Sequence, residues 1–475
     1  MASVAQPQTY YRTVSSFRDR PLALSFAAFF LATIVLNLVA YAIPSAIWAV
    51  FAAGLFGVLC YILARNAAAT FILFLPLIVL RLTEYISGVA IEAGAYMVET
   101  RQYGEATGAF ARLLIIQGGF FLVAALVVEQ VWPRIAPSFA LSEDIWNRRL
   151  RFVWLFVASV FGLLTLYVAY LGLSDSLPIF SGEDRFAFRW RIDSPILDAF
   201  INNRVVFAPI LGLLLMTRRS APLGALSIVW MLVLSLAIGE KFTSLVNIIT
   251  SASIPLGLRY IALGNRLPIS VAIKGGLAIS ILVIPAILLA YGARDNLDQA
   301  VERLGERVSL QGQLWFVSDR KDGDLFAFDE RALRTDVSTW MDEEKQSSTA
   351  VGTSFGLYYV MSDFTDSREL RWIMETGNGF VFAQQPYLLK ATGYTGLFVL
   401  MCALAVYASG VMLLLAYTLS RADIITSVLV GRIFVFMIGY FIGGFFWNLF
   451  GIKNLLTFGL IALALMLNRF RFRVN

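Results

Sequence analysis

Apolar residues follow one another in runs of about 20, and short polar stretches separate these runs. A helix of about 20 such residues crosses the roughly 30 Å of hydrocarbon in a bilayer, so each run predicts one membrane-spanning helix. We expect about 12 spans. They cover residues 21–43, 46–63, 67–88, 108–131, 152–173, 205–216, 221–238, a short eighth span containing Pro255, 275–291, 395–419, 424–447 and 449–467. The predicted fold is an all-α polytopic membrane protein.

The charges between the spans predict an orientation. Arginines follow the spans of even number, as in Arg65, the stretch Arg148 to Arg151, and the pair Arg218 and Arg219. Cytoplasmic loops carry such an excess of positive charge, which places both termini in the cytoplasm. No small-residue cleavage site follows the first apolar run, so we expect this run to be retained as a span. The same arginines account for the pI of about 9.3 in a chain that is 59% apolar. We therefore expect membrane lipid, and not nucleic acid, as a partner.

Two longer polar segments, residues 174–204 and 292–394, fall on the opposite, periplasmic side in this scheme. The second holds 17 Asp and Glu against 11 Lys and Arg, whereas the whole chain carries a formal charge of +6. It divides the chain into a first membrane part (1–291), a large, partly helical periplasmic loop (292–394) and a second membrane part (395–475). We expect the chemistry to lie in the two polar segments.

Composition excludes several kinds of site. The chain has no histidine, which removes Ser-His-Asp catalysis and imidazole metal ligands. Its two cysteines, Cys60 and Cys402, lie within apolar runs, so neither a disulfide framework nor a thiolate metal site is expected. No nucleotide-binding fingerprint is present. The prediction is a protein without a metal ion or other cofactor.

The first polar segment contains closely spaced arginines. From Arg185 onward, polar and apolar residues largely alternate, which predicts an extended strand with Arg189 and Arg191 on one side and aromatic rings on the other. Two neighbouring guanidinium groups suit a phosphate or a carboxylate. The alternative is a segment that anchors itself at the membrane interface through the same residues.

Other candidate residues lie at the ends of spans. Arg204 is at the entry to the sixth span, and Glu240 and Lys241 are at the end of the seventh. Arg204 and Lys241 could each bind an anionic group or anchor a helix end. Arg294 is placed where the ninth span meets the large loop. Within the third span, Arg81 and Glu84 are three residues apart and could pair on one helical face.

The large loop begins with a predicted amphipathic helix, in which apolar residues recur at helical spacing from Leu297 to Val308. It leads to the side chains of Gln311, Gln313 and Trp315. Amides form hydrogen bonds with sugar hydroxyls and an indole stacks on a pyranose ring, so this segment predicts saccharide recognition.

Together, these features resemble the O-antigen polymerases (Wzy type), which are related to the O-antigen ligases. The resemblance rests on the layout of spans and loops and on three short sequences: Pro178 to Gly182 followed by Arg185, Gly239 to Phe242, and Gln311 to Trp315. The ligases are associated with a loop histidine, which this chain lacks. The polymerase is therefore the favoured assignment.

The resemblance implies an enzyme of the bacterial inner membrane with a GT-C-like architecture. It would be a metal-independent glycosyltransferase, which transfers a growing glycan from undecaprenyl pyrophosphate to a repeat unit on the same lipid carrier. Arg189, Arg191 and Arg294 would hold pyrophosphate, with Glu240 as one candidate base. Substrate contacts would come from Arg185, Arg204, Lys241, Gln311, Gln313 and Trp315. A chain-length regulator protein is a partner that the family allows.

Three other functions stay open at this point. One is an O-antigen ligase or another transferase that uses lipid-linked sugars. Another is a flippase of lipid-linked oligosaccharide, which needs charged residues in a cavity between spans. The third is a scaffolding subunit that docks through its acidic loop.

Overall fold

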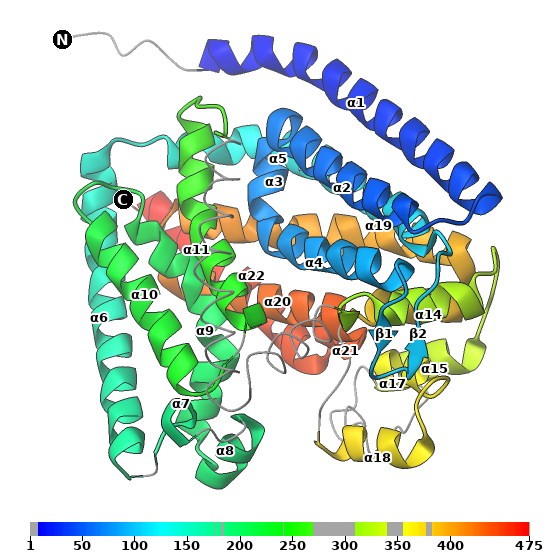
Figure 1. Cartoon of the computed structure of the whole chain (residues 1–475). Coiled ribbons are helices and arrows are strands. Elements are labelled where there is room, and N and C mark those ends of the chain that lie inside the picture. Colours follow the sequence, from blue (N-terminus) through cyan, green and yellow to red (C-terminus); the bar gives the residue numbers. More distant parts are fainter. Residues whose placement is uncertain are drawn as a thin grey trace.

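A computed structural model describes residues 8–174, 176–181, 185–240, 242–268, 309–339, 355–376 and 382–474. Nearly all of the regular structure is helical (Figure 1). The first half contains α1 (Gln8–Ala42), α2 (Ile47–Asn66), α3 (Ala68–Leu73), α4 (Leu75–Glu92), α5 (Ala109–Phe139), α6 (Glu143–Ser174), α7 (Pro178–Ser181), α8 (Arg185–Ile192), α9 (Pro195–Leu214), α10 (Ala221–Ala237) and α11 (Phe242–Ala262).

The second half contains α14 (Gln313–Asp322), α15 (Glu330–Thr339), α17 (Gly356–Met361), α18 (Ser367–Thr376), α19 (Gln384–Ser420), α20 (Ile424–Gly443), α21 (Trp447–Phe450) and α22 (Ile452–Val474). An antiparallel hairpin of β1 (Tyr96–Met97) and β2 (Gln102–Tyr103) joins α4 to α5.

Within the described residues, nine helices are long and apolar enough to cross a membrane, and α10 is a shorter apolar helix. Their outward faces carry bulky apolar side chains, such as Leu24 on α1 and Leu166 on α6, which are 71% and 70% exposed. Helices with exposed apolar faces are stable in lipid, where every backbone polar group is paired within the helix. The chain is therefore a multi-pass membrane protein. The predicted ninth span, 275–291, lies outside the described residues.

The predicted third span is broken into two helices. Pro76 at the start of α4 has no N–H to donate, and the chain changes direction at Phe74. At the other end of α3, where the chain leaves α2, the first N–H groups have no partner within the helix, and the Glu129 carboxylate of α5 accepts from Ala69 N and Thr70 N at 3.1 Å each. A side chain from a neighbouring helix thus stabilises the start of α3.

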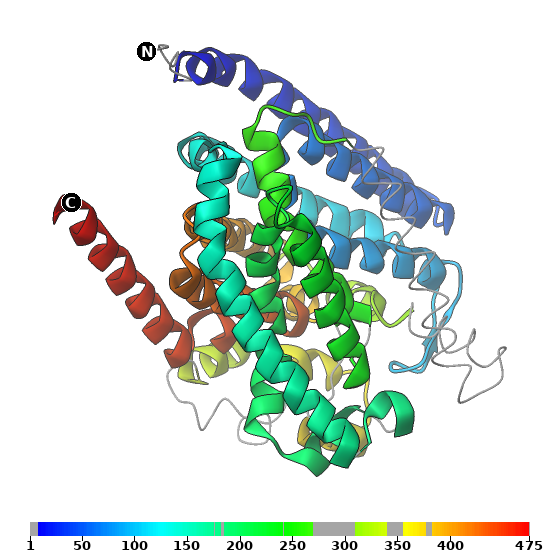
Figure 2. The same cartoon turned by 90° about the vertical axis from the view of Figure 1, so that its left-hand side faces the viewer.

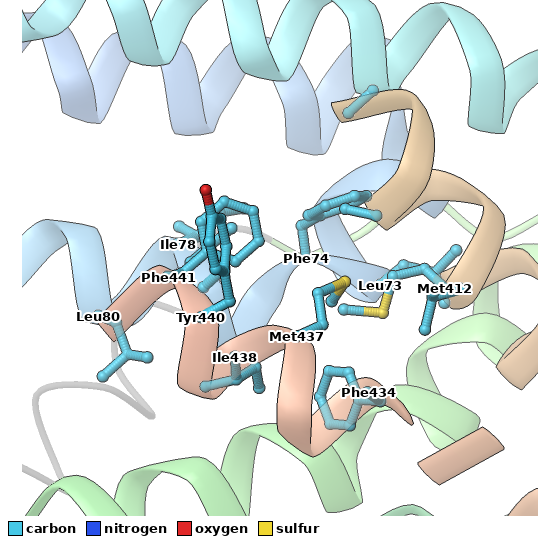
Figure 3. Close-up of a cluster of buried hydrophobic side chains, with 14 of the residues drawn as sticks. Leu73, Phe74, Ile78, Leu80, Met412, Phe434, Met437, Ile438, Tyr440 and Phe441 are labelled. Atoms are coloured by element: carbon cyan, nitrogen blue, oxygen red, sulfur yellow. The ribbon is translucent and has the colours of Figure 1, made fainter. Parts of the chain in front are cut away.

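The core lies where α3, α4, α5, α19 and α20 meet. Figure 3 shows Phe74, Met412, Met437 and Phe441 converging there from three parts of the chain. The rings of Phe74 and Phe120 meet edge to face at 5.8 Å, and those of Phe120 and Phe441 do so at 5.5 Å. On the other side of the molecule, α9 packs along α11 and α20, with α6 and α10 outside them (Figure 2).

The helix α19 reverses direction at Gly393, whose φ of 69° lies in the left-handed region. The Nε2 atom of Gln384 lies 3.1 Å from the sulfur of Met401, although the two residues are 17 positions apart. A straight helix would separate them by about 25 Å. Residues 384–392 therefore fold back beside residues 394–420. The membrane part of α19 begins next to the start predicted from the sequence, residue 395.

Helices α14, α15 and α17 each pack against α19, and α14 also contacts α4 and α5. They fall in the segment that the sequence predicts outside the membrane, so we call them the extramembrane unit. Its contact with the bundle buries apolar side chains of α14, such as Trp315 and Phe316, and also includes polar pairs. Arg112 of α5 donates from Nε to Asp319 of α14 at 2.8 Å, and the Tyr394 hydroxyl donates to the same carboxylate. Figure 1 shows α18 and the pair α7 and α8 at the same end of the molecule.

Candidate functional site

The candidate site lies at the end of the bundle where α8 leads into α9 and α10 leads into α11. We name it the α8–α11 cluster and define it as Arg189, Arg191, Arg204, Glu240 and Ser244. The three arginines lie on α8 and α9. Glu240 lies between α10 and α11, and Ser244 lies in α11. Folding brings Arg204 of α9 against Glu240 and Ser244, which are 36 and 40 positions later in the sequence.

Segment 185–192 forms the helix α8 and not the predicted extended strand. The alternation that suggested a strand covers only eight residues, and in a helix positions two apart point about 200° away from one another. Arg189 and Arg191 therefore do not form the expected fork on one side. The prediction of an extended segment is wrong, although both arginines remain at the same end of the bundle.

Arg189 pairs with a carboxylate of the next helix. Its Nη2 and Nε atoms lie 2.8 and 3.2 Å from Oδ1 of Asp198, in the first turn of α9. Ser194 caps that helix, since its hydroxyl accepts from Leu197 N at 3.4 Å. The ion pair fixes α8 against the start of α9, and any anion that binds Arg189 must compete with Asp198.

Arg191 is exposed, and its guanidinium carbon lies 5.4 Å from the centre of the Phe188 ring. Phe188 is itself fully buried. A ring that packs against one face of a guanidinium limits the orientations of the guanidinium, while the edge of the guanidinium still faces water. Part of the Arg191 guanidinium therefore faces the outside of the protein.

Arg204 and Glu240, two residues that were predicted independently, form one buried ion pair. Nη2 of Arg204 lies 2.8 Å from Oε2 of Glu240, and the side chains are 8% and 3% exposed. Ser244, which the sequence reading did not single out, completes a triangle: its hydroxyl accepts from Arg204 Nη2 and donates to Glu240 Oε2, both at 2.8 Å. Lys241 lies outside the described residues, as does Arg294, and nothing is described of the Arg185 side chain.

This triangle can hold charge in a fixed place with little water around it. A buried pair costs several kcal/mol in desolvation and persists where its geometry is good, so a missing partner is expensive. Glu240 has the chemistry of a proton acceptor, and the hydroxyl of Ser244 fixes its orientation. The triangle offers one carboxylate and one guanidinium group in fixed positions, and Arg189 and Arg191 lie on α8, which leads into α9.

Two of the large-loop residues that are predicted to bind sugar, Gln313 and Trp315, are buried inside the protein. The Trp315 side chain is 1% exposed and its indole N–H donates to Ala109 O at 2.8 Å, while Tyr394 meets the ring edge to face. Gln313 is fully buried and donates to Glu99. In this position neither side chain offers a surface for stacking on a sugar or for hydrogen bonds to one. Gln311 is partly exposed.

The segment from Ser309 to Trp315 instead fixes the loop to the bundle. The Ser87 hydroxyl donates to Ser309 O at 2.9 Å and accepts from Gly312 N at 2.8 Å. A side chain at position 312 would collide with Phe110, whose ring lies 2.8 Å from the place of a Cβ atom. The predicted amphipathic helix that ends at Val308 lies outside the described residues.

A second buried polar group lies inside the bundle and confirms the predicted pairing of Arg81 with Glu84. Their charged atoms lie 2.9 Å apart, and the side chains are 2% and 0% exposed. Gln117 of α5 donates to the same carboxylate oxygen at 3.1 Å. Gln385, from the folded-back arm of α19, lies across a small cavity of about 10 Å³. That volume accommodates about one water molecule.

Comparison with known proteins gives one partial match. A family model described as a family of unknown function (DUF6418) matches residues 350–458, which run from α17 into α22. The match covers less than half of the chain. None of the curated proteins and none of the solved structures gives a significant match.

Proposed function

We propose that the protein polymerises a surface polysaccharide at the periplasmic side of the bacterial inner membrane. It would transfer a growing glycan from undecaprenyl pyrophosphate to a repeat unit on the same lipid. The observation that carries this proposal is the α8–α11 cluster. Arg204 is buried against Glu240 and Ser244, and Arg189 and Arg191 lie on α8, which leads into the helix that carries Arg204.

The reaction requires charge stabilisation more than a cofactor. Attack by an acceptor hydroxyl on the donor sugar breaks the bond to the lipid pyrophosphate, which leaves with negative charge. Arginine side chains in fixed positions stabilise that charge. Arg191 is the exposed member of the cluster and would meet the pyrophosphate first. Glu240 is one candidate base for the acceptor proton, and Arg204 and Ser244 hold it in place.

The proposal includes the predicted orientation, with 12 spans and both termini in the cytoplasm. Arg218 and Arg219 lie between α9 and α10, at the end of α9 that is farther from α8. An O-antigen ligase or another lipid-linked transferase would use the same cluster with a different acceptor. The acceptor therefore has to be identified by experiment.

The second candidate function is that of a flippase, for which the buried group of Arg81, Glu84 and Gln117 is the supporting observation. Ionisable residues between spans often mark a transport path. However, the cavity beside them has room for about one water molecule, whereas an oligosaccharide headgroup needs a space of several hundred Å³. The polymerase is therefore the better supported proposal.

The test is the surface glycan of a strain that lacks the gene. For a polymerase, the ladder of glycans on a gel should collapse to core plus one repeat unit and return with the wild-type gene. For a ligase or a flippase, all glycan beyond the core should disappear. An unchanged ladder would contradict the proposal and favour a scaffolding role.

A further inference from the structure

The loop between α14 and α15 carries three exposed bulky apolar side chains in an otherwise polar segment. Leu325, Phe326 and Phe328 are 68%, 77% and 76% exposed. We call these three residues the apolar tip. Single exposed apolar residues are common on protein surfaces, but three within four positions form a patch that water solvates poorly.

The backbone of the tip is held firmly by the reversal in α19. Tyr394 N donates to Asp324 O at 2.9 Å, Thr395 N donates to Leu325 O at 3.0 Å, and Asp329 N donates to Ala391 O at 2.9 Å. At position 393, a Cβ atom would lie 2.6 Å from Ala327 N, so only glycine allows this approach. The tip therefore has a fixed place relative to α19.

The apolar tip lies at the end of one face of α19, and the exposed side chains of this face are mostly apolar or small, as in a helix that contacts lipid. Thr395, Val399, Ala403, Val406 and Gly410 are exposed and recur every three or four residues along one side of the helix. Val399 and Val406 are 60% and 51% exposed, as expected for side chains in contact with lipid. Since Thr395 is hydrogen-bonded to Leu325, the tip lies where this face reaches the membrane interface.

Positive charge lies beside the tip. Arg331 and Arg334 are exposed on α15 and, together with Phe328, line an open cleft. Glu330 and Asp329 line it too, but the Asp329 carboxylate accepts hydrogen bonds from the Tyr359 hydroxyl and from Ala332 N. The opposite face of α15 is buried through Ala332, Asp336 and Thr339. The two arginines therefore point away from the protein, where lipid phosphates would lie.

We propose that the apolar tip inserts into the bilayer interface and that Arg331 and Arg334 bind the phosphates of phospholipid headgroups. Aromatic and leucine side chains are favoured in the interface, and arginine pairs with phosphate at the same depth. The insertion holds α14, α15 and α17 against the membrane surface. It would do so whatever reaction the protein catalyses.

The test uses the full-length protein in lipid nanodiscs of phosphatidylethanolamine and phosphatidylglycerol. Cys60 and Cys402 are replaced by alanine, and one spin label is attached at Phe326→Cys or at Phe328→Cys. The labels are exposed to oxygen, which concentrates in lipid, and to a water-soluble nickel chelate. Val399→Cys serves as the lipid control and Arg371→Cys, on the exposed face of α18, as the aqueous control.

We expect the ratio of oxygen to nickel accessibility at positions 326 and 328 to be several-fold higher than at 371 and to approach that at 399. The pair of substitutions Arg331→Gln and Arg334→Gln should shift the ratio toward that at 371. A ratio at 326 equal to that at 371 would overturn the proposal, because the tip would then lie in water. A label that neither reagent reaches would also overturn it, because protein would cover the tip.

Discussion

The buried pair of Arg204 and Glu240 is the residue-scale feature on which the candidate site depends. Its two members are 36 positions apart, and their charges are separated from water on all but a small fraction of their surface. If one member of such a pair is removed, the other charge stays buried without a partner and without solvent to stabilise it. The consequences of removing one partner can therefore be predicted.

We expect Glu240→Gln to lower the free energy of unfolding by roughly 3–5 kcal/mol, the usual cost of breaking a buried pair. Arg101→Gln provides the control, since Arg101 and Glu369 form an exposed pair, 65% and 38% accessible, whose loss should cost less than about 1 kcal/mol. Thermal unfolding of the purified protein in detergent measures both. Equal effects of the two variants would show that the Arg204–Glu240 pair is not desolvated.

A second residue-scale prediction concerns pH. Burial raises the pKa of Asp336 to about 7, although the hydrogen bond from the Tyr387 hydroxyl favours the charged form and opposes the rise. The folded protein then holds a proton that the unfolded chain releases near its ordinary pKa of about 3.9. Stability should therefore be greatest near pH 4 and should fall as the pH rises to about 7, by at most about 1.4 kcal/mol per pH unit from this group.

The measurement is the unfolding temperature between pH 5 and pH 8. Asp336→Asn should remove the part of the slope that this carboxyl causes. Tyr387→Phe should move the decline to higher pH, because it removes the hydrogen bond to the charged form. An unchanged slope in Asp336→Asn would mean that α15 does not bury this group.

At the scale of elements, the reversal of α19 at Gly393 determines where the extramembrane unit sits. Gly393→Ala combines an unfavourable positive φ with a collision against the backbone of Phe326 and Ala327, and should cost about 1–3 kcal/mol. Gly410 lies on the same helix with open space around it, so Gly410→Ala should be neutral or stabilise slightly. Limited proteolysis of residues 323–329 should become faster only in the first variant. Equal rates in both variants would contradict the described reversal.

The elements also show what the sequence allows one to predict. Long apolar runs specify most spans, because lipid demands continuous helices, and the start of the tenth span is predicted next to the break at Gly393. The short segment α8 was predicted as a strand, since eight residues fit two periods about equally well. The contacts of Asp198 and Ser244 had no signal in the sequence, because they depend on how α8, α9, α10 and α11 pack. The chemistry of Trp315 predicts sugar binding, but the structure buries its side chain, and the indole N–H donates to Ala109 O.

At the scale of the whole molecule, the proposed reaction requires that the α8–α11 cluster and the extramembrane unit face the periplasm. Cysteine labelling tests this orientation in a chain whose own two cysteines are replaced by alanine. A membrane-impermeant maleimide should label Asp366→Cys in cells with a permeable outer membrane. It should label Arg219→Cys only after the inner membrane is opened. Labelling in the reverse order would place the cluster in the cytoplasm and exclude the proposed reaction.

The most direct measurement is the product that the purified protein makes in nanodiscs from undecaprenyl-pyrophosphate-linked repeat units, without a nucleotide sugar. We expect glycans of two or more repeat units on the lipid. We also expect a large loss of product in Arg191→Gln at an unchanged unfolding temperature, since Arg191 is exposed. Repeat units that stay single with the wild-type protein, or an Arg191→Gln variant of full activity, would contradict the proposed polymerase and its arginine site.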